Sequence, residues 1–420
     1  DQDMLCSNFV QLSSFIDEAA PNGQFPDFIH IPGIVNSLTQ IYSFEMDQSI
    51  QSGQDLSMST SGVFLPTRKV VLYSSSDYLF LAGEGYQRTK ENMWDFEDST
   101  FLVGYHLLEN GHIEPASTGQ VPGRIINKQS MDENNGYLRI ATTSSAVWTL
   151  ESDDIWKEHN QEASNHVSIF KLPEYSGNIF EMKQVGKIDE GLGRVGEIIS
   201  AIRFMGDTAL FQGEKTTYVW DLSNPDQPIN VGESSVNGIS DYLHVLDDGM
   251  MLSVGQKLDS DTGDTSGLLI TLLDLKDLEN PVRGEYTEEN PSVYSSSLVQ
   301  GDYRGVLYED ASNTLVVPVA VRDLKNGDFD GFHVYTVDGT GISPRFQFSH
   351  VDEFATEDPK NCWYDAYLQP RSMIIEGNLV TFNGHEVAKH NLYNGDAEWR
   401  SHPYTADLDD CAEYWDNEYP

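Results

Sequence analysis

The sequence predicts an all-β fold, a β-propeller of seven or eight four-stranded blades. Three observations lead to this prediction: one strand pattern recurs about seven times, turn dipeptides separate the strand-like runs, and helical periodicity is confined to the N-terminus. A repeat that contains several short strands is typical of propellers, where no repeat can bury its hydrophobic faces alone. The repeats should therefore share one domain.

The recurring strand carries one large residue near its end and is followed by a turn. The clearest copies are residues 218–222 and 272–275, each followed by an Asn-Pro dipeptide. The markers are Tyr42, Tyr105, Phe170, Trp220, Leu273, Tyr335 and Asn391, which lie 63, 65, 50, 53, 62 and 56 residues apart.

The N-terminus is the only place where helical spacing is clear. Leu5, Phe9, Leu12 and Ile16 predict a helix over residues 4–20, which Pro21 ends. We expect residues 1–30 to form a helical segment packed on the ring, and residues 31–420 to form the propeller.

After this segment, strand pairs alternate with turns. The pairs flank the turns at 74–77, 132–136, 206–208, 247–249, 310–313 and 376–378. Most pairs precede a marker strand, so one unit reads as a hairpin, a marker strand and an outer strand. Polar, aromatic-containing insertions at 86–100, 151–165 and 352–370 are expected to form long loops.

The charge balance is strongly acidic. The chain has 67 acidic and 25 basic residues, a formal net charge of −42. Such a surface repels phosphate backbones and excludes nucleic acid as a partner, while it favours cations, basic partners and a marine or halotolerant bacterial source. No apolar run approaches the ~20 residues of a membrane span.

One stretch of the chain resembles a known family. The residues that carry the likeness lie at 121–124, 130–133, 136–139, 141–143, 196–198, 203–207, 221–225 and 240–244. They are similar to secreted bacterial and archaeal proteins with a C-terminal β-propeller domain distantly related to WD repeats.

This resemblance implies a propeller and export from the cell, to the exterior, the cell surface or the periplasm. It implies no particular biochemical activity. Family members usually begin the propeller with an acidic strand and extra blades that have no match here, so we expect a processed or truncated portion that lacks the first blade or blades.

Two motif-like stretches fail on structural grounds. Residues 191–196 match the glycine pattern of dinucleotide sites, but a strand-like run follows where the site needs a helix. His385, Glu386 and His390 resemble a zinc-protease motif, yet the histidines are five apart and lie in a strand-like region. We interpret the first as a loop between blades and expect no metalloprotease.

Five polar residues are predicted to have structural roles. His244 is interpreted as a member of a buried network, with catalytic base as the alternative. Arg203 is expected to form a charge pair with Asp132 or Asp241, and Asp207 to occupy a tight turn.

Calcium is the predicted ion. Asp328 and Asp330 form one oxygen-rich turn, and Asp259, Asp261 and Asp264 form another. Cys362 and Cys411 are disulfide candidates, which leaves Cys6 without a partner among the chain's three cysteines.

These observations favour a secreted, non-enzymatic binding or assembly module, stabilised by calcium, whose protein or polysaccharide partner contacts loops on one face. The alternatives are an extracellular hydrolase or lyase with carboxylates at the central channel, and a protein that binds metal ions on an acidic face. No catalytic residue and no organic cofactor is predicted.

Overall fold

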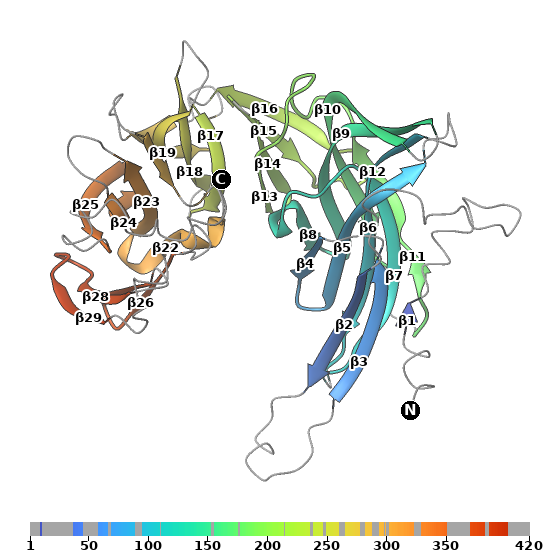
Figure 1. Ribbon diagram of the computed structural model, residues 1–420, viewed down its shortest axis with the longest axis horizontal. Coiled ribbons are helices and arrows are strands. Elements are labelled where there is room, and N and C mark those ends of the chain that lie inside the picture. Colours follow the sequence, from blue (N-terminus) through green and yellow to red (C-terminus); the bar gives the residue numbers. More distant parts are fainter. Residues whose placement is uncertain are drawn as a thin grey trace, which may run out of the picture. The chain divides into compact units, whose positions relative to one another are not determined.

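Figure 1 shows the computed structural model of the 420-residue chain. The described residues are 9–10, 37–44, 58–65, 69–88, 95–109, 111–152, 155–174, 177–213, 215–235, 238–246, 249–259, 265–277, 282–287, 294–297, 299, 302–322, 329–350, 370–382 and 386–401. Contacts divide the chain into two compact units, Asp1–Gly213 with Tyr218–Gly232, and Glu214–Thr217 with Glu233–Pro420.

The first unit begins with a three-stranded sheet in the order β1-β3-β2, followed by antiparallel meanders. The small sheet consists of β1 (Phe9–Val10), β2 (Ser37–Phe44) and β3 (Met58–Leu65). The first meander consists of β4 (Val70–Ser74), β5 (Tyr78–Arg88), β6 (Asp95–Leu107) and β7 (Ile113–Pro122).

Two further meanders follow. The second consists of β8 (Met131–Asn134), β9 (Tyr137–Ser152), β10 (Ile155–Lys171) and β12 (Lys183–Ile188). The 3-10 helix η3 (Lys128–Ser130) precedes it, and β11 (Phe180–Glu181) pairs in parallel with β7. The third consists of β13 (Ala201–Met205), β14 (Thr208–Gln212), β15 (Thr216–Asp221) and β16 (Ile229–Ser235).

The second unit repeats this pattern. Its first meander is β17 (Gly238–Val245), β18 (Met250–Leu258), β19 (Thr265–Asp274) and β20 (Val282–Thr287). Next come β21 (Tyr294–Ser297), η6 (Tyr303–Gly305), β22 (Leu307–Glu309), η7 (Asp310–Ser312), β23 (Thr314–Arg322), β24 (Phe329–Asp338) and β25 (Gly341–Ser349). The last is β26 (Arg371–Ile375), β27 (Asn378–Phe382), β28 (Val387–Asn391) and β29 (Ala397–Ser401).

The predicted repeat is confirmed as the unit of architecture. Six of the seven markers lie on the third strand of a meander, from Tyr105 on β6 to Asn391 on β28, and Tyr42 lies on β2. In the described part of the chain this gives six antiparallel meanders, which agrees with an all-β propeller. The blade number of seven or eight stays a prediction, as does the single domain over 31–420.

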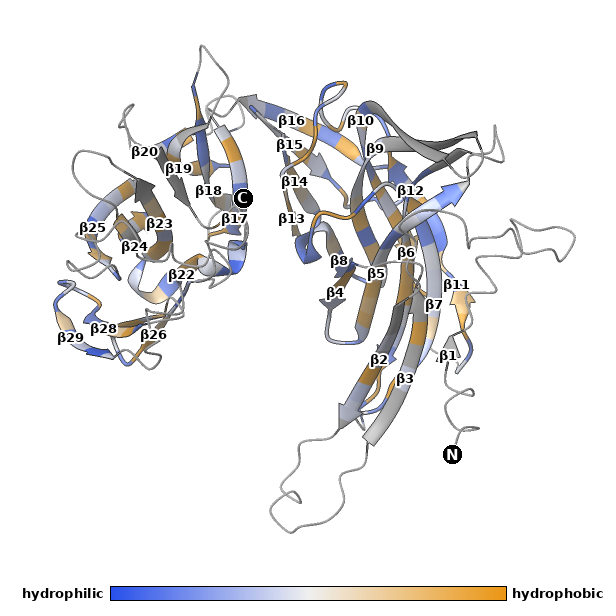
Figure 2. Ribbon diagram, in the orientation of Figure 1, coloured by the Kyte–Doolittle hydropathy of each residue, from blue (hydrophilic) through white to orange (hydrophobic). Residues whose placement is uncertain are grey.

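Both faces of the meander that contains β23 are buried within the second unit. On β23, Leu315 and Val317 pack into a cluster with Leu252 of β18, whereas Val316 packs with Leu379 of β27. Successive side chains of a strand point to opposite faces, so one strand serves two cores. In Figure 2, hydrophobic and polar residues are both present on strands such as β5 and β6.

Two expectations differ from the structure. Phe9 and Val10 form β1, paired in parallel with Gly62 and Val63, so backbone pairing prevails over helical spacing there; the rest of 4–20 lies outside the described residues. Most of 151–165 continues the β9–β10 ladder, and 95–100 belongs to β6, since polar composition does not stop backbone pairing. Residues 352–369 are not described.

Within the described residues, no helix has the length and hydrophobicity needed to span a membrane.

Candidate functional site

A pocket of about 520 Å³ lies in the first unit, where the first strands of three consecutive meanders come together. Its lining residues are Leu72, Tyr73, Ser74, Leu79, Lys128, Gln129, Met131, Asp132, Arg203 and Phe204. They come from β4, the start of β5, η3, β8 and β13. Five of these side chains are apolar or aromatic and five are polar or charged, so the pocket can contact both kinds of ligand group.

A capping box holds η3 at the edge of the pocket. The Asn127 side chain accepts a hydrogen bond from the Gln129 amide at 2.8 Å, and the Ser130 hydroxyl accepts one from the Asn127 amide at 3.4 Å. These reciprocal bonds satisfy backbone donors at the start of the short helix. They fix the position of the segment that presents Lys128 and Gln129 to the pocket.

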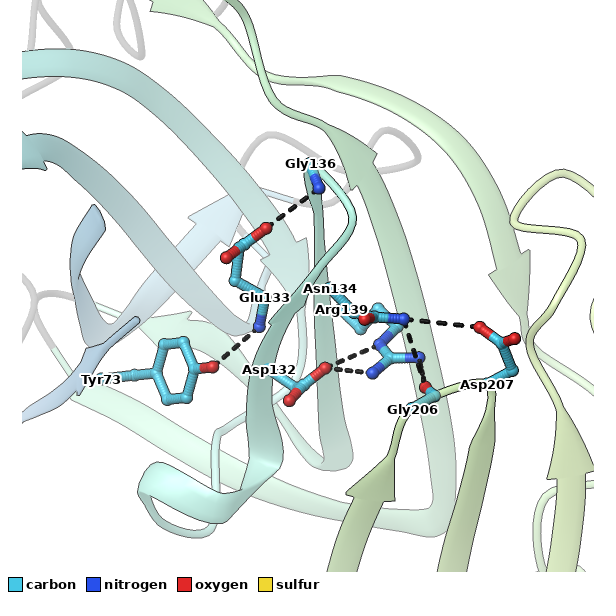
Figure 3. Close-up of polar contacts among 8 residues, drawn as sticks. All are labelled: Tyr73, Asp132, Glu133, Asn134, Gly136, Arg139, Gly206 and Asp207. Carbon is cyan, nitrogen blue, oxygen red and sulfur yellow. Dashed lines mark hydrogen bonds and ion pairs between the residues drawn. The ribbon is translucent and has the colours of Figure 1, made fainter. Parts of the chain in front are cut away.

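Arg139 and Asp132 form an ion pair at the wall of the pocket (Figure 3). They face each other across the β8–β9 ladder, and Arg139 Nε donates to Asp132 Oδ2 at 3.0 Å. Arg139 Nη1 also donates to the Gly206 carbonyl at 2.5 Å, and the guanidinium lies 5.1 Å from the Phe204 ring centroid. Only 4% of the Arg139 side chain is exposed. One arginine thus links the second meander to the β13–β14 turn.

The tip of the β8–β9 hairpin extends this network. Asn135 and Gly136 both have positive φ, 53° and 79°, as a two-residue turn of this type requires. The Gly136 amide donates to the Glu133 side chain at 3.0 Å, and Asn134 Nδ2 donates to Asp207 Oδ1 at 3.5 Å. The hairpin therefore contacts the β13–β14 turn of the next meander at two places, through Asn134 and through Arg139.

Tyr73 connects the same hairpin to β4. Its hydroxyl accepts a hydrogen bond from the Glu133 amide at 2.9 Å (Figure 3). Burial raises the pKa of Tyr73, an effect that outweighs the opposing contribution of this hydrogen bond. The phenol is therefore neutral, and it ties the first meander to the second at the pocket wall.

The structure brings together three of the five residues that the sequence singled out. Asp132 and Arg203 line the pocket, and Asp207 lies in the adjoining turn. The partner of Asp132 is Arg139, whereas the side chain of Arg203 makes no hydrogen bond or ion pair with the described residues. The sequence reasoning missed Arg139. A turn at Asn135-Gly136 pairs residue 134 with 137 and therefore 132 with 139. The pairing of Asp132 with Arg139 could thus have been predicted from the position of the turn.

The other two residues lie in the second unit, on β17. The Tyr242 hydroxyl and Nδ1 of His244 are 2.8 Å apart, and the Tyr308 ring centroid lies 5.0 Å from that of His244. Asp241 occupies a bulge between Ser240 and Tyr242, and its Oδ2 is buried without a hydrogen-bond partner among the described residues. Burial raises the pKa of Asp241 to about 6.

Asp241→Asn is expected to raise stability at neutral pH. The folded state holds the proton up to about pH 6, whereas the unfolded chain releases it near 3.8. The free energy of unfolding therefore falls as the pH rises between these two pKa values. At 1.36 kcal/mol per pKa unit, the total decrease is at most about 3 kcal/mol. Urea unfolding at pH 4 and pH 7 measures the gain, and Asp226→Asn at an exposed turn corrects for the lost charge. Equal gains for both variants at pH 7 would contradict the prediction.

The metal and cysteine candidates are only partly described. Asp259 is exposed at the end of β18, and Asp330 lies on β24. Asp261, Asp264, Asp328, Cys6, Cys362 and Cys411 lie outside the described residues. Within the part of the chain that is described, no three histidine, cysteine or acidic side chains form a metal-binding group. Calcium and the disulfide stay predictions.

The two rejected motifs occupy strand connections and strands. Residues 191–196 join β12 to β13, so the helix that a dinucleotide site requires does not follow. Glu386 immediately precedes β28 and His390 lies on it, and both residues are buried at 1% relative exposure. His385 lies outside the described residues.

Comparisons with known proteins concern the fold. A family model described as a β-propeller domain matches residues 12–394. The chain is 32% identical over 215 residues to an uncharacterized protein of Archaeoglobus fulgidus, which covers 50% of this chain and 29% of the relative. It is also 32% identical over 204 residues to an uncharacterized protein of Methanocaldococcus jannaschii, and this match covers 48% of this chain and 28% of the relative.

The chain thus spans less than a third of the length of these relatives. Among solved structures, the β-propeller domain of Cps50 (Swd1) from Myceliophteria thermophila matches with a TM-score of 0.30 and 11% identity. That match covers 79% of this chain and 97% of the other.

Proposed function

The chain belongs to the β-propeller domain family, and on this basis we propose that it is a binding and assembly module whose partner enters the pocket of the first unit. The observation that carries the proposal is Arg203. It lies at a pocket of about 520 Å³, and its side chain makes no hydrogen bond or ion pair with the described residues. An arginine in this state is ready to receive a carboxylate.

The pocket differs in charge from the rest of the chain. Arg139 compensates the one carboxylate in its lining, Asp132, so Arg203 and Lys128 leave the pocket with local positive charge. The field of distant acidic residues is screened beyond about 8 Å at physiological ionic strength. A ligand carboxylate that reaches Arg203 is therefore attracted in spite of the net charge of −42.

The apolar lining narrows the class of partner. Leu72, Leu79, Met131 and Phe204 surround the basic groups. A sugar acid would leave these side chains without apolar contacts, whereas a peptide can bury a neighbouring hydrophobic residue against them. We therefore take the partner to be a protein segment in which an acidic residue lies beside apolar ones.

Arg203→Met is expected to weaken the binding of such a segment by about 10-fold or more, because a hydrogen bond to a charged group contributes about 1.5–3 kcal/mol. The probe is a fluorescein-labelled peptide of alternating leucine and glutamate, measured by fluorescence anisotropy. The same peptide with glutamine in place of glutamate should bind the unaltered protein as weakly as the acidic peptide binds the variant.

Lys183→Met is the matched control, since it removes one positive charge from an exposed position of β12. It should leave the affinity unchanged. Equal affinities for the glutamate and glutamine peptides, or no effect of Arg203→Met, would contradict the proposal.

We further propose that the protein acts outside the cell and is stabilised by calcium. The first part is supported by the likeness to secreted propeller proteins, and the second by the oxygen-rich sequences around Asp259 and Asp330. The peptide titration and a thermal melt, each run in EDTA and in millimolar calcium, test whether the protein binds calcium. A ligand that binds the folded state must raise the melting temperature. Immunodetection only in the cytoplasmic fraction of source cells would contradict export.

A further inference from the structure

A hydroxyl, an imidazole and a carboxylate lie in series on the surface of the second meander. Ser164 Oγ is 3.0 Å from His166 Nε2, and His166 Nδ1 is 3.2 Å from Asp189 Oδ1. Ser164 is exposed, and the side chains of His166 and Asp189 are 15% and 38% exposed. Both distances lie within the reach expected between a nucleophile, its base and the group that orients the base.

The backbone explains why the three side chains meet. Ser164 and His166 are two residues apart on β10 and so lie on one face of the sheet. The β10–β12 ladder ends at Val167 and Ile188, so the next residues, His166 and Asp189, adjoin each other. A register shift between Asn160 and Ser164 interrupts the regular pairing just before the serine. Such irregularities change the direction of side chains and are common next to active sites.

Asn165, between the serine and the histidine, fixes the strand from the opposite face. It is 5% exposed, and its Oδ1 accepts hydrogen bonds from the Thr143 hydroxyl at 2.8 Å and the Ile199 amide at 3.3 Å. Its Nδ2 donates to the carbonyls of Leu192 and Glu197 at 3.0 and 2.8 Å. Four bonds to one buried side chain hold the neighbouring residues in place, as a preorganised site requires.

The glycine-rich loop 191–196 lies beside the serine. The Gly196 amide donates to the Ala163 carbonyl at 3.2 Å, and Gly191, Gly193 and Gly196 have φ of 76°, 89° and 82°. The backbone amides of Gly191, Gly193 and Val195 make no hydrogen bond with the described residues. The loop therefore carries backbone N–H groups that have no partner among the described residues.

Asp189 is kept in the state that orients the histidine. Partial burial opposes its charged form, but hydrogen bonds from Lys187 and His166 outweigh that effect and hold the pKa of Asp189 below its ordinary value. The carboxylate is thus ionised, and it accepts from the Nδ1–H tautomer of His166, which leaves Nε2 as the acceptor for the serine proton.

We propose that Ser164, His166 and Asp189 form an esterase site for small acyl esters. Ser164 Oγ bonds to the acyl carbon as its proton passes to His166 Nε2. The ester C–O bond then breaks, and the leaving alkoxide takes that proton. Water, deprotonated by the same nitrogen, cleaves the acyl-serine, releases the carboxylic acid and restores the hydroxyl. The exposed position of Ser164 fits esters carried on a larger molecule.

The test is hydrolysis of p-nitrophenyl acetate by the full chain, combined with fluorophosphonate labelling and peptide mass spectrometry. We expect the label on Ser164. Ser164→Ala should abolish the labelling and, together with His166→Ala, lower the rate by at least about 100-fold, the lower end of what a positioned base contributes. Asp189→Asn should lower the rate while the label still reaches Ser164.

Ser76→Ala is the matched control, because Ser76 is exposed and donates to Asp77 without a histidine nearby. It should leave both rate and labelling unchanged. Thermal melts show whether the variants are folded, as expected for substitutions at the surface. Label on other residues, or a rate that Ser164→Ala does not alter, would overturn the proposal and leave the peptide-binding site unaffected.

Discussion

Glu386→Ala is expected to lower the free energy of unfolding by about 3–5 kcal/mol, the cost of removing a buried carboxylate from its partners. Glu386 Oε2 lies 2.6 Å from His350 Nδ1, and the two side chains are 2% and 1% exposed. Without the carboxylate, His350 Nδ1 loses its neighbour in the protein interior, and Arg400 Nη1, which lies 3.6 Å from Glu386 Oε1, loses its counter-charge.

The pair joins two consecutive meanders of the second unit, which is why its loss should spread. His350 follows β25, whereas Glu386 immediately precedes β28. His350 Nε2 also lies 3.0 Å from the hydroxyl of Thr381 on β27, and its ring makes an edge contact with Phe348 at 5.9 Å. Buried polar contacts of this kind help to fix how one sheet packs on the next.

Urea unfolding compares Glu386→Ala with Lys389→Ala. Lys389 forms an ion pair with Glu398 in which both side chains are 39% exposed, so its loss should cost less than about 1 kcal/mol. A double variant, His350→Phe with Glu386→Leu, should recover part of the loss because it leaves no buried charge. Similar effects of Glu386→Ala and Lys389→Ala would show that the buried pair contributes little.

The repeat could be predicted from the sequence because the strand pattern is local. A marker such as Trp220 is followed by a turn within a few residues, and the same order recurs on β6, β10, β19, β24 and β28. The role of Glu386 could not be found in this way. In sequence it adjoins His385 and suggests a metal site, but its partner His350 is 36 positions away and meets it only through the packing of β25 against the last meander.

The candidate site likewise combines residues that the sequence identifies with partners that only the structure identifies. Asp132, Arg203 and Asp207 were singled out from short motifs, and all three lie at the pocket or its adjoining turn. Their partners depend on strand register, which assigns Arg139 to Asp132. The relation of Ser164 to Asp189 depends on register too, since 25 residues separate them and the β10–β12 ladder brings them together. Composition alone does not specify such pairs.

Arg139→Met is expected to lower the free energy of unfolding by about 2–4 kcal/mol. The side chain of Arg139 is 4% exposed and that of Asp132 is 24% exposed, so the effect is placed below that of a fully enclosed pair. The variant keeps the length and apolar stem of the side chain, and loses the donors to Asp132 and to the Gly206 carbonyl. Each unsatisfied group adds to the cost.

Asp132→Asn separates the charge of the pair from its hydrogen bonds. The asparagine oxygen still accepts from Arg139, so this variant should lose less stability than Arg139→Met. Lys69→Met is the control: its ion pair with Glu84 has side-chain exposures of 55% and 19%, and we expect a change below about 1 kcal/mol. A loss from Arg139→Met no larger than that of the control would contradict a structural role for the pair.

The same variants connect the stability of the first unit to its proposed ligand. Arg139→Met frees the charge of Asp132 at the pocket wall, so the glutamate peptide should bind more weakly than it binds the unaltered protein. Asp132→Asn removes that charge and should bind the peptide at least as well as the unaltered protein. If Arg139→Met weakens binding and Asp132→Asn does not, electrostatics at the wall controls affinity, whereas parallel losses in both variants would indicate that only the shape of the pocket matters.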